Sequence, residues 1–174
     1  VTDPASVAQG IADVLHSHGQ IDCLINNAGV WIEGAVETND ASAIVDAIDT
    51  NFLGVMYVSS AVIPGMKERR DGLIININSE NGLRANKERS IYTASKWGVT
   101  GFTASMQPEL TPYGIRMTGI HPGKMRTDLF SKAGIEKSMD NALEVEHAVS
   151  AIDFIRSLPR DVFIPQLSIR SIRQ

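Results

Sequence analysis

A tyrosine and a lysine stand four residues apart, at Tyr92 and Lys96, in a segment whose pattern favours the start of a helix. Residues at positions i and i+4 share one face of a helix, so the ammonium group can lie beside the phenol. The pKa of a free tyrosine is about 10, and a cation within roughly 4–6 Å can lower that pKa by about 1–3 units. The pair is therefore suited to general acid–base chemistry on an oxygen atom near neutral pH.

A serine hydroxyl is placed to act on the same substrate oxygen. Ser79 ends an apolar run and precedes Tyr92 by 13 residues, with a polar loop at 80–90 between them. If the run is a strand and the helix starts beside its end, both hydroxyls face one crevice. A Tyr-x-x-x-Lys pair alone is usually a solvated pair on a helix surface, so the neighbouring motifs decide between the two interpretations.

Strand and helix patterns alternate along the chain, which favours one α/β domain (1–174) built on a parallel sheet covered by helices. We expect Pro108 to bend or end the third helix early, and Pro165 to mark an edge or bulge of the last strand. The predicted strands are 21–29, 71–79, 115–123 and 161–171, and the predicted helices are 3–19, 39–70, about 91–113 and 144–159.

Ligands of parallel sheets bind outside the carboxyl ends of the strands, which directs attention to 26–29, 79–82 and 121–127. Sequence motifs are found at these strand ends and in the predicted helices: NNAG at 26–29, NFLG at 51–54, NINSENG at 76–82, YTASK at 92–96 and HPGKMRT at 121–127. In order and spacing these five motifs resemble the short-chain dehydrogenase/reductase family, over nearly the whole chain.

The resemblance implies a fold and an activity. The fold would be the C-terminal part of a Rossmann-like, doubly wound parallel sheet in three αβα layers, with the first strands missing. The activity would be hydride transfer between a nicotinamide cofactor, NAD or NADP, and a small alcohol or carbonyl substrate. Related enzymes of the family perform epimerisation or dehydration with similar residues, so these reactions are the alternative within enzymes.

The resemblance also implies a role for each motif residue. In catalysis, Tyr92 would be the acid/base, Lys96 would lower the pKa of Tyr92, Ser79 would polarise the carbonyl, and Asn51 would hold a water in a proton relay. Thr127 is also placed to start the next helix, and glycines at 29 and 123 also suit ordinary turns. The cofactor would be bound by Asn27, Ala28, Gly29, Tyr92, Lys96, Pro122, Gly123 and Thr127.

One family motif has no counterpart here. The family begins with a strand and a glycine-rich turn whose helix N-terminus holds the pyrophosphate, and VTDPASV at 1–7 resembles the point just after the third family strand. We therefore expect a piece of a longer enzyme that by itself binds NAD(P) weakly or not at all. The alternative is a truncated, non-catalytic interaction or oligomerisation module. The residues that select NAD or NADP would lie in the absent part.

Three further expectations concern partners. The long helices would form a homodimer or homotetramer, as the two central helices of the family do. The segment at about 127–144 would shape the substrate pocket. Arg84, Lys87 and Arg89 stand in the loop before the third helix, where they would meet an anionic substrate or, in the favoured interpretation, only solvent.

The bulk composition argues against several other classes. The net charge of -4 gives no electrostatic reason to expect nucleic acid or an anionic membrane as partner, and no apolar run approaches membrane-spanning length. The one cysteine, Cys23, cannot form an internal disulfide and fits a reducing, cytoplasmic location. The sequence has no Cys/His cluster with zinc spacing and no Gly-x-Ser-x-Gly motif, so neither a metal site nor an esterase is expected.

Overall fold

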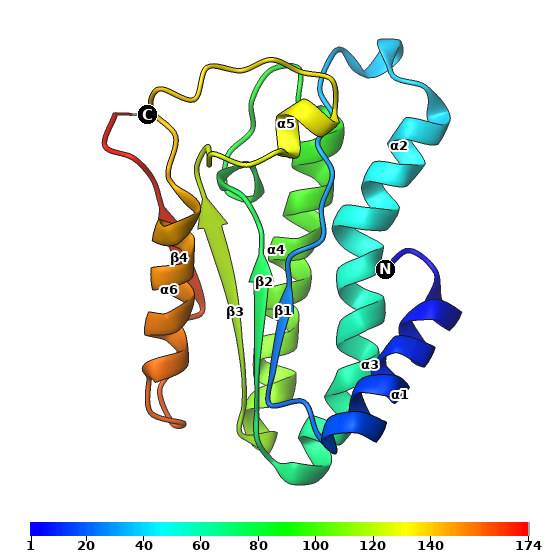
Figure 1. Ribbon diagram of the computed structural model, residues 1–174, viewed down its shortest axis with the longest axis vertical. Helices are drawn as coiled ribbons and strands as arrows, with labels where there is room; N and C mark the ends of the chain where they lie inside the picture. Colours follow the sequence, from blue (N-terminus) through cyan, green and yellow to red (C-terminus); the bar gives the residue numbers. More distant parts are fainter. Residues whose placement is uncertain (174) are drawn as a thin grey trace.

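The chain folds around a parallel sheet with helices on both faces (Figure 1), which confirms the predicted α/β class. The computed structural model describes residues 1–173. The strands pair in the order β1-β2-β3-β4, and each pair is parallel. They are β1 (Cys23–Asn26), β2 (Gly72–Ile77), β3 (Ile115–Pro122) and β4 (Gln166–Ile169), and the helices are α1 (Pro4–His18), α2 (Ala41–Ile48), α3 (Gly54–Arg69), α4 (Ser90–Leu110), α5 (Leu129–Lys132) and α6 (Val145–Ser157).

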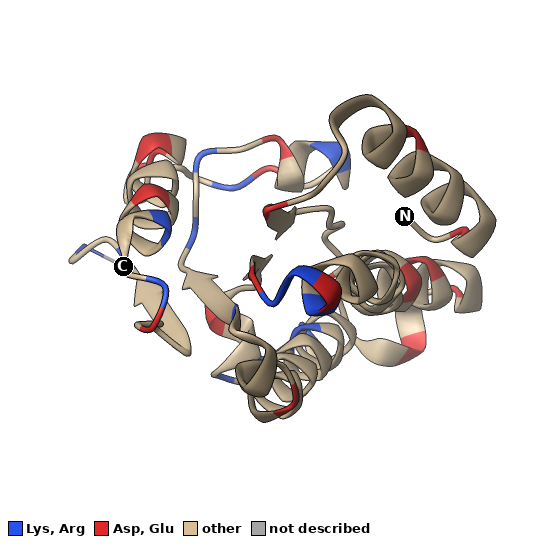
Figure 2. Cartoon of the chain, turned by 90° about the horizontal axis from the view of Figure 1, so that it is seen from below, with Lys and Arg blue, Asp and Glu red and all other residues tan. Residues whose placement is uncertain are grey.

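The sheet separates two hydrophobic cores, which gives the predicted three layers. Successive side chains of a strand point to opposite faces, so a strand that is covered on both sides is mostly apolar, as β2 is apart from the buried Asn76. Viewed from below, α3 and α4 lie on one side of the strands and α6 lies on the other (Figure 2). One core contains Val62, Ile63, Met66, Ile74, Leu110, Ile115 and Met117, and the other contains Leu73, Ile75, Ile120 and Ile155.

The helix predicted over 39–70 forms one continuous rod, but a π-helical segment at Asp49–Leu53 joins α2 to α3. By length and composition alone the rod Ala41–Arg69 is able to cross a membrane, with a mean hydropathy of 1.2, contrary to the expectation that no run approaches that length. A core helix of a soluble protein meets the same criterion. Here Val62, Ile63 and Met66 pack on the sheet, although only 22% of the most apolar stretch of the rod is buried.

The two prolines behave differently from each other. Pro108 does not end its helix early, because α4 continues to Leu110 and is followed by a 3-10 turn at Thr111–Tyr113. The Thr111 N–H bonds to the Gln107 carbonyl oxygen, so the backbone stays helical past the proline. Pro165 directly precedes β4, which is an edge strand of the sheet as predicted.

Replacement of glycine by alanine should have opposite effects on stability at two positions. Gly114 ends the 3-10 turn with a φ of 68°, and a Cβ there would lie 2.8 Å from the carbonyl oxygen of Arg70. Gly10 lies inside α1 with nothing within 4 Å of a Cβ. We predict that Gly114→Ala lowers the free energy of unfolding by about 1–3 kcal/mol, because strain and a backbone clash combine. Chemical denaturation measures the change.

Gly10→Ala is the matched control, and it should raise stability by about 0.5–1 kcal/mol because alanine favours the helix interior. A Gly114→Ala variant as stable as the parent protein would contradict the backbone conformation described for this turn.

Candidate active site

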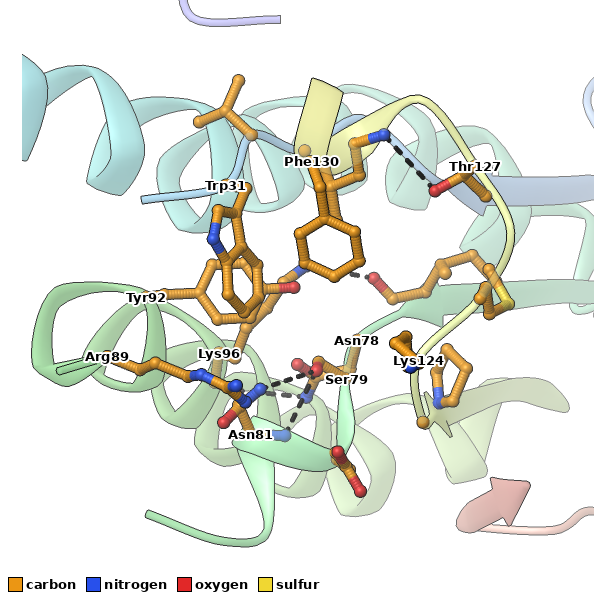
Figure 3. Close-up of a pocket in the computed structure, with 18 of the residues that line it drawn as sticks. Trp31, Asn78, Ser79, Asn81, Arg89, Tyr92, Lys96, Lys124, Thr127 and Phe130 are labelled. Carbon is orange, nitrogen blue, oxygen red and sulfur yellow. Dashed lines mark hydrogen bonds between the residues drawn. The ribbon is translucent and has the colours of Figure 1, made fainter. Parts of the chain in front are cut away.

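A pocket of about 580 Å³ opens where the carboxyl ends of β2 and β3 meet the first turns of α4 (Figure 3). Parallel strands point their carboxyl ends to one edge of the sheet, so segments far apart in the sequence converge there. The pocket is lined by most of the predicted site residues: Asn27, Gly29, Ser79, Tyr92, Lys96, Pro122, Gly123 and Thr127. Ala28 is exposed outside the lining, and Asn51 is buried behind it.

Ser79 and Tyr92 are brought together across the pocket floor. Ser79 follows the last residue of β2 by two positions, and Tyr92 lies in the first turn of α4. A side-chain hydrogen bond joins them, and the backbone N–H of Asn81 donates to the Ser79 Oγ at 3.1 Å. The two hydroxyls therefore face the same small volume, as their spacing predicts.

Lys96 lies one turn further along α4 and is almost completely buried, with 4% of its surface exposed. Its Nζ donates to the carbonyl oxygen of Ile77 at 3.3 Å and lies 5.8 Å from the centre of the Tyr92 ring. Burial disfavours the charged form and lowers the pKa of Lys96 to about 8. The amine is thus still mostly charged at pH 7, close to the phenol.

The pKa of Tyr92 differs from the expectation. Burial raises it to about 12, although the hydrogen bond from Ser79 and the charge of Arg89 act to lower it. The predicted net lowering is wrong, because loss of hydration outweighs these two effects, and the cation that acts on the phenol is Arg89. Sequence spacing indicates the distance between two groups but not how well water hydrates them. Because Tyr92 is only 4% exposed, its loss of hydration determines the direction of the pKa shift.

Asn51 sits in the π-helical segment and reaches the loop after β1. Its Oδ1 accepts from the Val30 N–H at 2.8 Å, and its Nδ2 donates to the Val30 carbonyl at 3.0 Å and to Ser95 Oγ at 3.2 Å. These bonds occupy the amide with protein partners. The proton relay through a water behind Lys96 stays a prediction.

The side of the pocket predicted to bind the cofactor includes the loop after β1. A Cβ at Gly29 would lie 3.2 Å from the Oδ1 of Asn51 and 3.9 Å from the Nζ of Lys96, so the glycine lets this loop pack closely against both side chains. Pro122 and Gly123 border the same pocket at the end of β3. These residues fit a nicotinamide nucleotide.

Thr127 lies both at the pocket and at the start of α5, and its contact with the cofactor stays a prediction. It lines the pocket, and its Oγ1 accepts from the Leu129 N–H at 3.4 Å at the start of α5. The segment at 127–144 shapes the pocket as expected, since residues 127–130, 132 and 137 belong to the lining.

Among the lining residues that were not predicted as site residues, four lie around one aromatic ring: Trp31, Arg89, Phe130 and Lys137. The Trp31 ring centre lies 4.4 Å from that of Tyr92 and 4.7 Å from that of Phe130. An aromatic residue two positions after NNAG was the available sequence indication for Trp31. Its packing against two distant segments is a product of the fold, which spacing alone does not reveal.

No metal site accompanies these groups within residues 1–173, where no three His, Cys, Asp or Glu side chains are grouped to hold an ion.

Comparison with known proteins gives consistent matches. The family model described as short chain dehydrogenase matches residues 1–138. An uncharacterised oxidoreductase of Staphylococcus saprophyticus is 32% identical over 99% of this chain and 73% of its own length. The trans-4-hydroxycyclohexanecarboxylate dehydrogenase of Sinomonas cyclohexanicum is 36% identical over 79% of this chain and 52% of its own length.

Among solved structures, the closed form of a serine dehydrogenase complexed with NADP+ superposes with a TM-score of 0.93 at 28% identity, over 99% of this chain and 74% of that one. The chain thus spans between 52% and 74% of the lengths of these three proteins.

The burial of Lys96 predicts a pH-dependent stability difference. Its pKa is about 8 in the folded protein against 10.5 in the unfolded chain, so the folded state gains stability as pH rises from 8 to 10.5 and loses it as pH falls through this window. Lys96→Met removes the buried charge. The variant should be more stable than the parent at pH 7, by up to about 3 kcal/mol at roughly 1.4 kcal/mol per pKa unit.

Urea denaturation at pH 7 and at pH 10 measures this difference, which should shrink at the higher pH. Lys87→Met is the control, because the Lys87 side chain is 91% exposed and its replacement should leave the pH dependence unchanged. An equal gain at both pH values would show that packing, and not charge, accounts for the Lys96→Met effect.

Proposed function

Since the chain belongs to the short-chain dehydrogenase family, we propose that it carries the catalytic machinery of an NAD(P)-dependent oxidoreductase that interconverts an alcohol and a carbonyl compound. The observation that supports this most strongly is the meeting of Ser79, Tyr92 and Lys96 in one pocket, which Gly29 also lines. A non-catalytic module would have no use for a buried lysine, which costs stability at neutral pH.

The two hydroxyls supply the proton chemistry. In the direction of reduction, Ser79 donates a hydrogen bond to the carbonyl oxygen and Tyr92 gives its proton to the oxygen as negative charge develops. A pKa of about 12 keeps Tyr92 protonated throughout the neutral range, which suits a proton donor to an alkoxide. NAD(P), when bound, supplies or accepts the hydride.

Lys96 stabilises the phenolate that Tyr92 becomes when it gives up its proton. Once Tyr92 has lost its proton, the phenolate is a buried anion, and the Lys96 ammonium is the nearby buried cation that offsets it. The same pair serves oxidation, in which the phenolate takes the proton of the alcohol. The position of Lys96 beside Gly29 also supports a hydrogen bond to the nicotinamide ribose.

The matched proteins support oxidation and reduction more than epimerisation or dehydration. Those described above are named as an oxidoreductase and as dehydrogenases, and the serine dehydrogenase structure contains NADP+. We propose NADP or NAD as the cofactor. We also propose a cytoplasmic location and small-molecule substrates, with no nucleic acid or membrane as partner.

Self-association is a further part of the proposal, through α3 and α4. Trp97 on α4 is 51% exposed, and Val45 on α2, the N-terminal part of the rod, is 54% exposed. Large apolar side chains that project from long helices are typical of subunit interfaces. A homodimer or homotetramer that buries this helical surface would account for the apolar composition of the rod Ala41–Arg69.

Tyr92→Phe tests the proposed acid/base. In the full-length protein, turnover of aldehydes or ketones with NADPH or NADH, followed by nicotinamide absorbance, should fall by about 10²–10⁴-fold, because the proton donor is lost. Cofactor affinity should change little. Tyr57→Phe, which removes a hydroxyl on α3 remote from the pocket lining, is the control. If the Tyr92→Phe enzyme keeps most of its activity, another group transfers the proton.

Trp97→Glu tests the proposed interface. A charge placed in an apolar interface core is costly, so sedimentation should show a smaller assembly than the parent forms. The control is Val14→Glu on α1, where 40% of the side chain is exposed outside the proposed surface. An unchanged assembly in the Trp97→Glu variant would exclude this face of α4 from the interface.

A further inference from the structure

The part of the pocket beside Tyr92 is an aromatic corner lined by cations. Trp31, 8% exposed, contacts both Tyr92 and Phe130 through its ring. Two charges lie over this ring: the Arg89 Cζ is 5.3 Å from its centre, and the Lys137 Nζ is 4.4 Å from it. A group that reaches the Ser79–Tyr92 hydroxyls from this side must pass an apolar surface with cations at its border.

The two cations are not equivalent. Lys137 is paired with Glu33, with an Nζ–Oε2 distance of 2.6 Å, and the Trp31 Nε1 donates to the same oxygen at 3.0 Å. Arg89 makes no salt bridge within residues 1–173, although its charge also acts on the Glu33 carboxylate. The guanidinium is therefore the cation of this corner that no carboxylate of the described residues contacts directly.

Backbone hydrogen bonds hold Arg89 in place at the start of α4. Its carbonyl accepts from the Thr93 N–H at 2.7 Å at the start of α4, and the preceding Glu88 carbonyl accepts from Gly34 at 2.8 Å. The side chain of Arg89 is half-buried and lines the pocket, whereas Arg84 and Lys87 are exposed outside it. The interpretation of the whole loop as solvated is wrong for Arg89.

The charge of the pocket opposes that of the protein. The chain has a net charge of -4, yet cations outnumber carboxylates in the pocket lining, which contains Arg89, Lys96, Lys124, Lys132 and Lys137 against Glu80 and Asp128. Such a reversal raises the local concentration of anions. Figure 3 shows Arg89 with Trp31 and Tyr92 at one side of the pocket, away from Thr127 and Lys124 at the other. The position of Arg89 therefore suits the substrate more than the cofactor.

We infer that the substrate is an alcohol or carbonyl compound that carries a carboxylate, bound by Arg89, on an apolar body that packs against Trp31 and Phe130. A guanidinium presents parallel N–H donors that match a carboxylate in a bidentate manner, and such charge-assisted bonds are stronger than neutral ones. The inference rests on the proposed function, since the reacting oxygen lies at Ser79 and Tyr92. Arg89 would then determine specificity and orient the substrate without taking part in proton transfer.

A binding experiment tests the inference without turnover. The full-length protein, saturated with NADP, is titrated calorimetrically with benzoate and with benzamide, which share a flat ring and differ in charge. We expect benzoate to bind about 10–100-fold more tightly, as a charge-assisted hydrogen bond of about 1.5–3 kcal/mol would give. Arg89→Gln should abolish the preference, Arg89→Lys should retain part of it, and Lys87→Gln should leave it unchanged.

Three results would overturn the inference. They are equal affinities for the two ligands, a preference for benzoate that survives Arg89→Gln, and failure of benzoate to bind at millimolar concentration. If Arg89→Gln weakens NADP binding as much as benzoate binding, the guanidinium belongs to the cofactor site and the inference is also wrong. A thermal melt of each variant verifies that it is folded.

Kinetics separate this inference from the proposed function. With 4-carboxybenzaldehyde and 4-formylbenzamide as paired substrates, Arg89→Gln should raise KM about 10–100-fold for the carboxylate only. Because the charge of Arg89 also acts on the pKa of Tyr92, any change in kcat should be the same for both substrates. An equal rise in KM for the two substrates would contradict a role in binding the carboxylate. Because the calorimetric comparison needs no reaction, its outcome stands whether or not Tyr92→Phe abolishes turnover.

Discussion

The junction between α4 and the end of β2 is the constraint on which the site depends. Asn78, between β2 and Ser79, donates through its Nδ2 to the Lys96 carbonyl at 3.1 Å and to the Thr100 Oγ1 at 2.8 Å, and Thr100 in turn donates to the Gly82 carbonyl at 2.9 Å. A Cβ at Gly82 would lie within 2.8 Å of both side chains, so glycine is required for this close approach. These bonds fix the helix that carries the tyrosine and lysine against the strand that precedes the serine.

The same junction sets the electrostatics. The close packing of α4 on the strand ends removes water from both Tyr92 and Lys96. This loss of hydration favours the neutral form of each group, so the pKa of Tyr92 is raised and the pKa of Lys96 is lowered. The phenol remains a proton donor in the neutral range, and the ammonium remains close enough to offset a phenolate once it forms. Burial of the two groups lowers the stability of the folded chain but holds a proton donor and a cation in one place. Groups with shifted pKa values of this kind are common at functional sites.

The sequence predicts how the strands and helices are arranged, but not every local conformation or pKa shift. Alternating apolar patterns predicted the parallel strands, and the rule for their carboxyl ends predicted that Ser79, Tyr92, Gly29 and Pro122 would meet. The π-helical turn at Asp49–Leu53 has no residue signature, and it was missed. The sign of the Tyr92 pKa change and the direction of Arg89 depend on burial, which is set by segments far away in the sequence, such as the one that supplies Phe130.

A crystal structure of the full-length protein with NADP and a bound carbonyl substrate analogue tests the central claim most directly. We predict that the substrate oxygen lies within hydrogen-bond distance, about 2.6–3.2 Å, of both the Ser79 Oγ and the Tyr92 hydroxyl, with the nicotinamide on the Gly29 and Pro122 side. An analogue bound in the pocket with its oxygen directed away from both hydroxyls would contradict it.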